Sequence, residues 1–164
     1  MKIKRVLIGI SALFLVACGS STDDNSNSIF DNTASSMKQN IIGTWESECL
    51  NANNISTIMV ITFTATEKLG YENLYSDLNC SNLNFKSDYN PITYTIGEAT
   101  TSKNGENSVE LNFTYPDNLN RITYSMVRTS ANKLYIANND ILYGGETVEE
   151  RHNDFSSSIP LTKK

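Results

Sequence analysis

The chain is poor in the residues that most metal sites and nucleic-acid surfaces need. Its 164 residues include one His, three Cys and one Trp, and 13 Lys and Arg stand against 18 Asp and Glu, a net charge of −5. A nucleic-acid surface requires a cationic patch that displaces counterions. A His- or Cys-rich metal site requires several ligands of those types. We therefore expect no nucleic-acid partner, no metal and no cofactor.

The motifs of common enzyme classes are also missing. The sequence contains no Gly-x-Ser-x-Gly, no His-Glu-x-x-His and no glycine-rich phosphate loop. The single His152 lies in the charged stretch 149–154. Such a stretch before a final strand is more typical of a solvated loop than of an acid–base cluster. We expect a protein that is not an enzyme.

The one long apolar run lies at the amino terminus. Lys2, Lys4 and Arg5 precede eleven residues, Val6–Val16, that are apolar apart from Gly9 and Ser11. A helix that crosses a bilayer needs about 20 apolar residues. A basic start followed by a shorter apolar run is typical of a signal peptide. We predict that residues 1–17 are removed, which changes the net charge from −5 to −8 because three basic residues leave.

The end of this run, Leu15-Val16-Ala17-Cys18, resembles the lipobox of bacterial lipoproteins. The resemblance implies cleavage between Ala17 and Cys18 and a lipid on the Cys18 sulfur. Gly19 follows instead of Asp, and in Gram-negative members of the family this favours the outer membrane over the inner one. We expect a lipid-anchored protein with its body in the periplasm, and display on the cell surface is left open.

Beyond Cys18 the composition changes twice. Residues 19–40 are rich in Ser, Asn, Asp and Thr, so we predict that residues 18–40 are the lipidated cysteine and a disordered tether. A short helix around Ala34–Gln39 is left open. Residues 41–164 contain short runs of strand-like pattern at the spacing of a sandwich or barrel. The runs are 41–49, 57–65, 71–78, 92–97, 107–115, 121–129, 133–137 and 155–162. We predict an all-β fold, a small antiparallel up-and-down barrel of about eight strands.

Two cysteines remain after Cys18 is assigned to the lipid. Cys49 and Cys80 form an even pair in a protein expected to be exported. In an oxidising envelope such a pair predicts a disulfide. Free thiols or a thiolate metal site are the alternatives, but neither cysteine belongs to a Cys-x-x-Cys pair.

The first strand begins with Gly43-Thr44-Trp45, which resembles the start of lipocalins and of lipocalin-like domains in bacterial lipoproteins. The resemblance implies a barrel whose base is closed by Trp45. It also implies an Arg across that indole, for which Arg151 is our first assignment and Arg128 the second. The alternative is that Trp45 is an ordinary core aromatic.

Two functions remain, a surface-acting structural or interaction module of the envelope and a binding module for a small apolar ligand. For the binding module, the candidate lining residues are Tyr94, Phe113, Tyr115 and Tyr124. Large side chains dominate the expected inward positions: Phe63, Ile92, Tyr94, Ile96, Leu111, Phe113, Tyr115, Ile122, Tyr124 and Met126. Because an eight-stranded barrel is narrow, we expect a packed or shallow interior. This favours the surface module, with an envelope protein as its partner.

Overall fold

A computed structural model describes residues 33–52, 54–117, 119, 121–137 and 145–164. The expected signal peptide and Cys18 lie outside the described residues. The elements are α1 (Ala34–Asn40), β1 (Gly43–Ser47), β2 (Leu50–Ala52), β3 (Ile55–Phe63), β4 (Glu67–Tyr75), β5 (Leu83–Thr101), β6 (Asn107–Thr114), β7 (Ile122–Ser130), β8 (Lys133–Ile136) and β9 (Leu161–Lys163). No helix in this described part is long and apolar enough to span a membrane.

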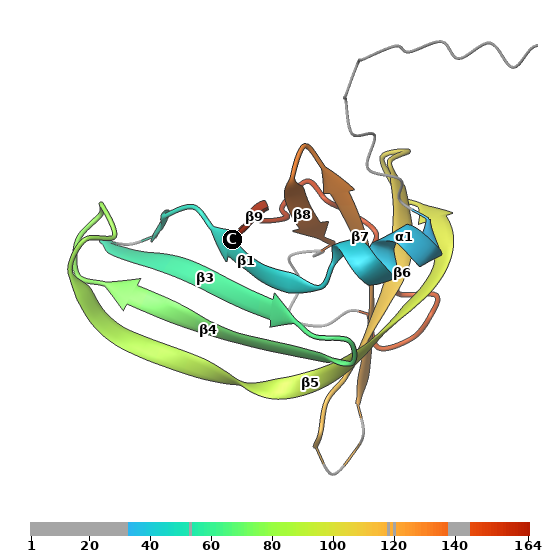
Figure 1. Cartoon of the computed structure of the whole chain (residues 1–164), viewed down its shortest axis with the longest axis horizontal. Coiled ribbons are helices and arrows are strands. Elements are labelled where there is room, and N and C mark those ends of the chain that lie inside the picture. Colours follow the sequence, from blue (N-terminus) through green and yellow to red (C-terminus); the bar gives the residue numbers. More distant parts are fainter. Residues whose placement is uncertain (1–32, 53, 118, 120, 138–144) are drawn as a thin grey trace, which may run out of the picture.

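The strands form one antiparallel sheet that closes on itself (Figure 1). The order is β1-β9-β8-β7-β6-β5-β4-β3-β2, and β1 also pairs with β3. Eight strands therefore make a barrel, and the short β2 extends it beside β3. The predicted all-β, up-and-down barrel is confirmed. The run at 155–162 was expected to be one strand, but only its end contributes, as β9.

Three tight hairpins lie at one end of the barrel. Asn104-Gly105 connects β5 to β6, an Asn-Gly pair typical of hairpin turns, and Gly105 has a φ of 82°. Ala131-Asn132 connects β7 to β8 with φ of 48° and 63°, the left-handed pair that a two-residue hairpin favours. At the β3–β4 turn, the Thr64 hydroxyl accepts a hydrogen bond from the Glu67 amide at 3.0 Å.

Helix α1 packs at this same end, which we call the packed end. Met37 and Ile41 have no exposed surface, and Trp45 is 2% exposed. All three belong to the main hydrophobic core. Thr33 caps the helix by accepting from the Ser36 amide. The predicted tether is therefore wrong for residues 34–40, because Met37 ties this segment to the core.

The long strand β5 was predicted only over residues 92–97. Its 19 residues pair with β4 along the first part and with β6 from Thr93 onward. The β4–β5 register shifts between Lys68/Gly70, opposite Asn90-Pro91. Proline has no amide proton for a ladder and is tolerated at such bulges. The part of β5 before Pro91 is an arm that, with β3 and β4, extends beyond the barrel (Figure 1).

Strand β7 presents the opposite face from the one predicted. Residues paired across strands share a face, and Leu111 pairs with Ser125 while Phe113 pairs with Thr123. Thr123 and Ser125 therefore face the interior. The positions expected inside, Ile122, Tyr124 and Met126, face outward. Met126 is nevertheless buried, because it packs with Ala137 and Phe155 in a second cluster outside the barrel wall. The apolar residues that alternate along β7 therefore lie on the outer face of the barrel, where Met126 packs in this outer cluster, and not in the main core.

Candidate binding cavity

The barrel is not filled at the end opposite α1, which we call the open end. A cavity of about 560 Å³ lies there. Its lining combines apolar, aromatic and a few charged side chains: Met59, Ile61, Lys68, Leu69, Gly70, Tyr89, Asn90, Ile92, Tyr115, Pro116, Asp117 and Arg121. Pockets for small molecules have volumes of about 300–1,000 Å³. The expected packed interior is therefore not found in this region, where the cavity is half open to solvent.

A second cavity of about 320 Å³ adjoins the first. Met59, Ile61, Lys68 and Tyr115 line both. Strand β7 contributes Thr123 and Ser125, whose short side chains leave space where Tyr124 and Met126 were expected. The Lys68 side chain is part of the wall of both cavities.

The sheet register places Lys68 inside. On β4, Lys68 pairs with Phe63 of β3 and with Ile92 of β5. Both partners are buried core residues. Because directly paired residues point to the same side of a sheet, the lysine side chain points into the barrel. Its Nζ lies 5.0 Å from the centre of the Phe113 ring.

Lys68 is poorly compensated. Within the described residues, the Phe113 ring is the only partner of its ammonium group, which has neither an ion pair nor a hydrogen bond there. Burial lowers the pKa of Lys68 below its ordinary value because the charged form loses its hydration. A cation–π contact offsets part of this cost, about 0.5–2 kcal/mol. The interior therefore has an ammonium group without a charged partner beside a mainly apolar cavity.

The mouth of the cavity contains a compensated pair. Arg121 Nε lies 3.7 Å from Asp117 Oδ2, and the guanidinium lies 4.7 Å from the centre of the Tyr115 ring. Asp117 also accepts a hydrogen bond from the Arg121 amide at 3.1 Å. These contacts order the start of β7 against the end of β6. The two charges largely cancel, so they do not compensate Lys68.

Tyr89 lies over Gly70 on the arm. A Cβ at Gly70 would come within 3.1 Å of the Tyr89 ring and 3.0 Å of the Val60 carbonyl. Glycine at this position therefore lets the tyrosine ring approach the strand closely. Burial, together with the hydrogen bond to Glu72 and its charge, raises the pKa of Tyr89, which stays neutral at physiological pH. Tyr89 is 39% exposed and forms one side of the entrance.

Of the four predicted lining residues, two line the cavities, one lies in the packed core and one faces outward. Phe113 lines the smaller cavity, and Tyr115 lines both. Tyr94 lies in the packed core, with its ring 5.1 Å from Phe63 and its hydroxyl donating to the Thr64 carbonyl at 2.5 Å. The prediction that Tyr124 lines the cavity is wrong, because Tyr124 faces outward on β7. The guanidinium carbon of Arg151 lies 5.3 Å from the centre of its ring.

The expected stacking of Arg151 on Trp45 is also wrong. Lys163 of β9 is the cation over Trp45, with its Nζ 5.3 Å from the ring centre. Gly43 makes room for it, since a Cβ there would lie 3.0 Å from Lys163 Cε. Trp45 does close the packed end, and its Nε1 donates to the Ile41 carbonyl at 2.7 Å.

Arg151 instead binds the outer face of β6 and β7. It donates to Asn112 Oδ1 at 2.6 Å and to the Ser125 carbonyl at 2.8 Å, and it lies 3.3 Å from Glu110 Oε1. The second assignment, Arg128, lies over Tyr135 at 4.2 Å and pairs with Glu106. The stretch expected to be a solvated loop thus contains two buried residues, Arg151 and His152, each 8% exposed.

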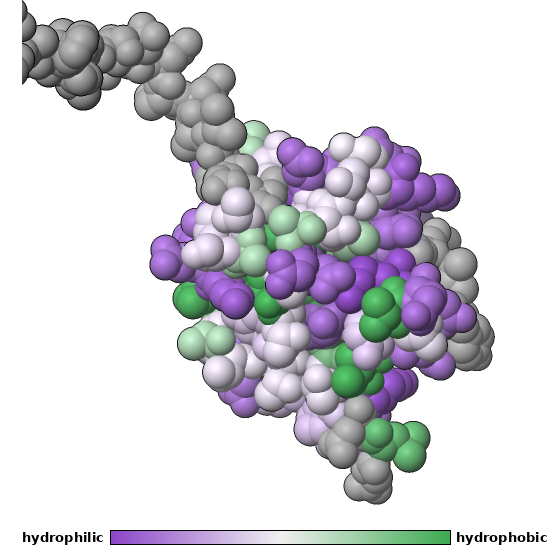
Figure 2. All heavy atoms as spheres, turned by 90° about the vertical axis from the view of Figure 1, so that its right-hand side faces the viewer, coloured by the Kyte–Doolittle hydropathy of each residue, from purple (hydrophilic) through white to green (hydrophobic). Residues whose placement is uncertain are grey.

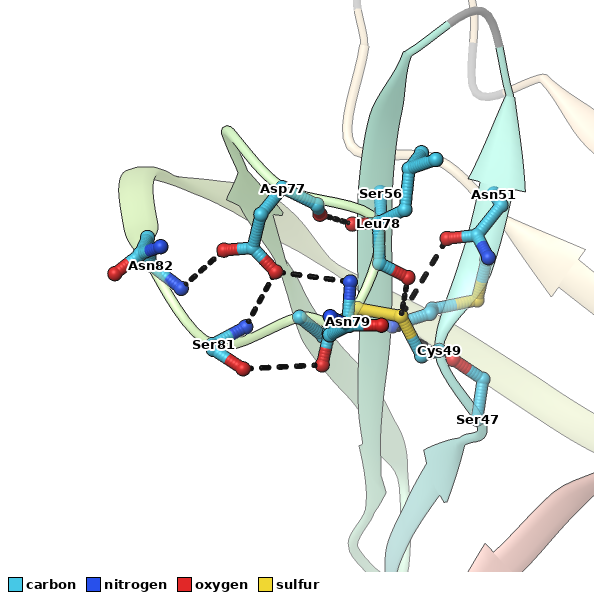
Figure 3. The surroundings of a disulfide bond; sticks show 11 residues. Ser47, Cys49, Asn51, Ser56, Asp77, Leu78, Asn79, Ser81 and Asn82 are labelled. Atoms are coloured by element: carbon cyan, nitrogen blue, oxygen red, sulfur yellow. Dashed lines mark hydrogen bonds between the residues drawn. A yellow bond between two sulfur atoms is a disulfide. The ribbon is translucent and has the colours of Figure 1, made fainter.

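The predicted disulfide between Cys49 and Cys80 is present, with Cα atoms 5.9 Å apart. It joins the β1–β2 junction to the loop at the tip of the arm (Figure 3). In that loop Asp77 accepts hydrogen bonds from the Asn79, Ser81 and Asn82 amides. These bonds lower the pKa of the Asp77 carboxyl. The disulfide therefore holds the tip of the arm, away from the cavity.

The residues that sequence reasoning missed are Met59, Lys68, Gly70 and Tyr89. The β4 run was placed too late, at 71–78, because its inward positions include Lys68, Gly70 and Glu72 and show no apolar alternation. Only the pairing partners identify its inner face. Among the described residues, no group of metal-ligating side chains converges.

Comparisons with protein-family models, with curated proteins and with solved structures found no match.

Proposed function

We propose that the barrel is a binding module that takes one small, largely apolar ligand into the open end. The observation that supports this is the 560 Å³ cavity with a mainly apolar wall and a few polar groups. That combination is the usual form of a small-molecule site. The closed eight-stranded sheet is compatible with a lipocalin-like binding fold.

The two ends of the barrel support the same proposal. The packed end is filled by fully buried side chains, whereas the open end leaves Met59 and Tyr115 half-buried and Tyr89 exposed. An interior built only for stability has no reason to leave this space, because close packing is what stabilises a core. A ligand would cover these side chains.

A neutral fluorescent probe tests the proposal. N-phenyl-1-naphthylamine should bind the chain from Gly19 to Lys164 saturably, with one site and micromolar affinity. Met59→Trp fills the cavity wall and should abolish binding. Ile58→Trp, on the outer face of the same strand, is the control and should leave binding intact. Absence of saturable binding to the unsubstituted chain would exclude the proposal.

We further propose that the protein is held at the outer membrane by lipid on Cys18. The support is the sequence Leu15-Val16-Ala17-Cys18 after a short apolar run. Two or more acyl chains anchor a protein far more firmly than one. Cys18→Ala should lose incorporation of a fatty-acid analogue and leave the membrane fraction. Unchanged labelling would end this proposal.

A surface-acting module remains the second candidate, supported by one region only. The arm exposes Leu83 and Phe85 by 58% and 60%, and among the described residues the part of β5 before Thr93 pairs with β4 alone. By contrast, the face in Figure 2 is mostly hydrophilic with scattered apolar spots. A photo-crosslinking residue at Phe85 should yield one discrete protein adduct in cells if this candidate is right, and one at exposed Lys103 should not.

A further inference from the structure

We infer that the ligand is an amphipathic acid whose ionised head pairs with the Lys68 ammonium group inside the barrel. This inference rests on the proposed function and adds the chemical class of the ligand. It concerns a monoanionic head, such as a carboxylate, on an apolar tail. The cavities, the direction of the Lys68 side chain and the charges around it support the inference independently of one another.

The first observation is the position of the ammonium group. Lys68 is half-buried, points inward from β4 and lines both cavities. A bound molecule of cavity size would therefore meet Lys68. Met59, Ile61 and Ile92 line the same space and would surround an apolar tail.

The second observation is the balance of charge. Three ionic side chains line the larger cavity, and two of them, Asp117 and Arg121, pair with each other at the mouth. Lys68 is left with the Phe113 ring alone among the described residues. Glu72 also faces inward on β4, but it hydrogen-bonds Tyr89. Lys68 is therefore the ionic side chain in the lining of this cavity that has no charged partner among the described residues. A single negative charge on the ligand would balance it.

The third observation is that position 68 has a lysine and not an apolar residue of similar length. A Met at this position would keep the length and the apolar stem without the cost of desolvating a charge. Other lysines of the protein form surface pairs, such as Lys86 with Asp88 at 2.8 Å. A partly desolvated ammonium group gains more from a charged hydrogen-bond partner than an exposed one does. The direction of the Lys68 pKa shift, downward through burial, agrees with this cost.

The test compares an acid with its matched alcohol. Dodecanoate and 1-dodecanol would compete with N-phenyl-1-naphthylamine for the chain from Gly19 to Lys164, which contains the whole closed barrel and its core. The measured quantity is the ratio of their inhibition constants at neutral pH. In Lys68→Met the preference for dodecanoate should fall about tenfold, the size expected for loss of one charge-assisted bond. Lys68→Arg keeps the charge and should keep most of the preference.

Lys86→Met is the matched control. Lys86 also lies over an aromatic ring, that of Tyr71 at 4.1 Å, but is exposed and paired with Asp88. Its substitution should leave the ratio unchanged. Should Lys68→Met not fold, Lys68→Gln provides the second neutral variant for the same ratio.

The outcomes separate the two claims. If the probe does not bind the unsubstituted chain, the proposed function fails and this inference falls with it. If the probe binds but the dodecanoate-to-dodecanol ratio is the same with and without the Lys68 charge, the binding module stands and the inference is overturned. If the ratio falls in the neutral Lys68 variants and not in Lys86→Met, the inference is supported.

Discussion

The two ends of this barrel are built on opposite rules. At the packed end, Trp45 is 2% exposed, its indole donates to a carbonyl, and Met37 and Ile41 close the space behind it. At the open end, Lys68 lacks a carboxylate partner among the described residues and borders about 560 Å³ of cavity. The same strands run through both regions, so strand pairing does not explain the difference. Side-chain choice does.

This difference separates residues kept for stability from those that a fold alone does not need. Removing a packed-end side chain should destabilise the protein and leave the cavity chemistry intact. Changing an open-end residue should alter ligand binding in the cavity and have little effect on the free energy of unfolding. Substitutions at the two ends should therefore differ in their effects on the free energy of unfolding and on ligand binding.

Trp45→Ala should have the largest effect. Deleting a fully buried Trp typically costs about 3–5 kcal/mol, since its transfer energy is lost and a cavity remains. Met59→Ala, at the open end, should cost only about 1 kcal/mol because Met59 is half-buried beside existing space. Urea unfolding followed by circular dichroism measures both. Equal losses in free energy of unfolding would erase the distinction between the ends.

Loss of the disulfide should come next. Closing a loop between residues 31 apart stabilises by roughly 3–4 kcal/mol in the chain-entropy model. Cys49→Ser and Cys80→Ser should lose similar amounts, and the double variant should be no worse than either. Because the bond ties the tip of the arm, amide exchange should quicken first in β4 and early β5 and last in β6. Uniformly faster exchange would contradict this.

Lys68→Met should stabilise the folded protein. The change removes a desolvated charge and keeps a similar volume, and a gain of roughly 1 kcal/mol is typical of such substitutions. Lys86→Met, on the surface, should change the free energy of unfolding by less than about 0.5 kcal/mol. A destabilised Lys68→Met would mean that the ammonium group is structural.

The gain from Lys68→Met should shrink as the pH rises. The pKa of Lys68 is lower in the folded protein than in the unfolded chain, where it is near 10.5. At pH values between these two pKa values, the unfolded chain binds more protons than the folded protein does. The free energy of unfolding of the unsubstituted protein therefore rises with pH, whereas that of Lys68→Met lacks this contribution, so the difference between them becomes smaller. The raised pKa values of Tyr89 and Tyr94 act in the opposite direction but equally in both proteins. Unfolding at pH 7 and pH 10 measures the difference.

The sequence predicts the fold better than the inner face of the open end, and the reason is physical. The all-β barrel, the Asn104-Gly105 turn and the Cys49–Cys80 pair follow from local signals of alternation, turn chemistry and cysteine number. The role of Trp45 in the core was also foreseen. Its cation was not, because Lys163 reaches the indole only through closure of the sheet by β9.

The open end could not be predicted, since its inner face is defined by pairing and not by composition. Lys68, Gly70 and Glu72 show no apolar pattern, and only the register with β3 places them inside. On β7 the pattern pointed the wrong way, because Met126 is buried in the outer cluster with Phe155. A chain that buries apolar residues on both faces of a strand gives no signal of which face is the interior.

The three methionines at positions 37, 59 and 126 allow the most direct test of the difference between the ends. Met37 lies in the packed end, Met59 lines both cavities, and Met126 lies in the outer cluster. In the methyl-labelled chain from Gly19 to Lys164, titration with dodecanoate should shift the Met59 methyl resonance saturably and leave Met37 and Met126 in place. Equal shifts at all three, or a shift at Met37 alone, would contradict the assignment of the binding site to the open end.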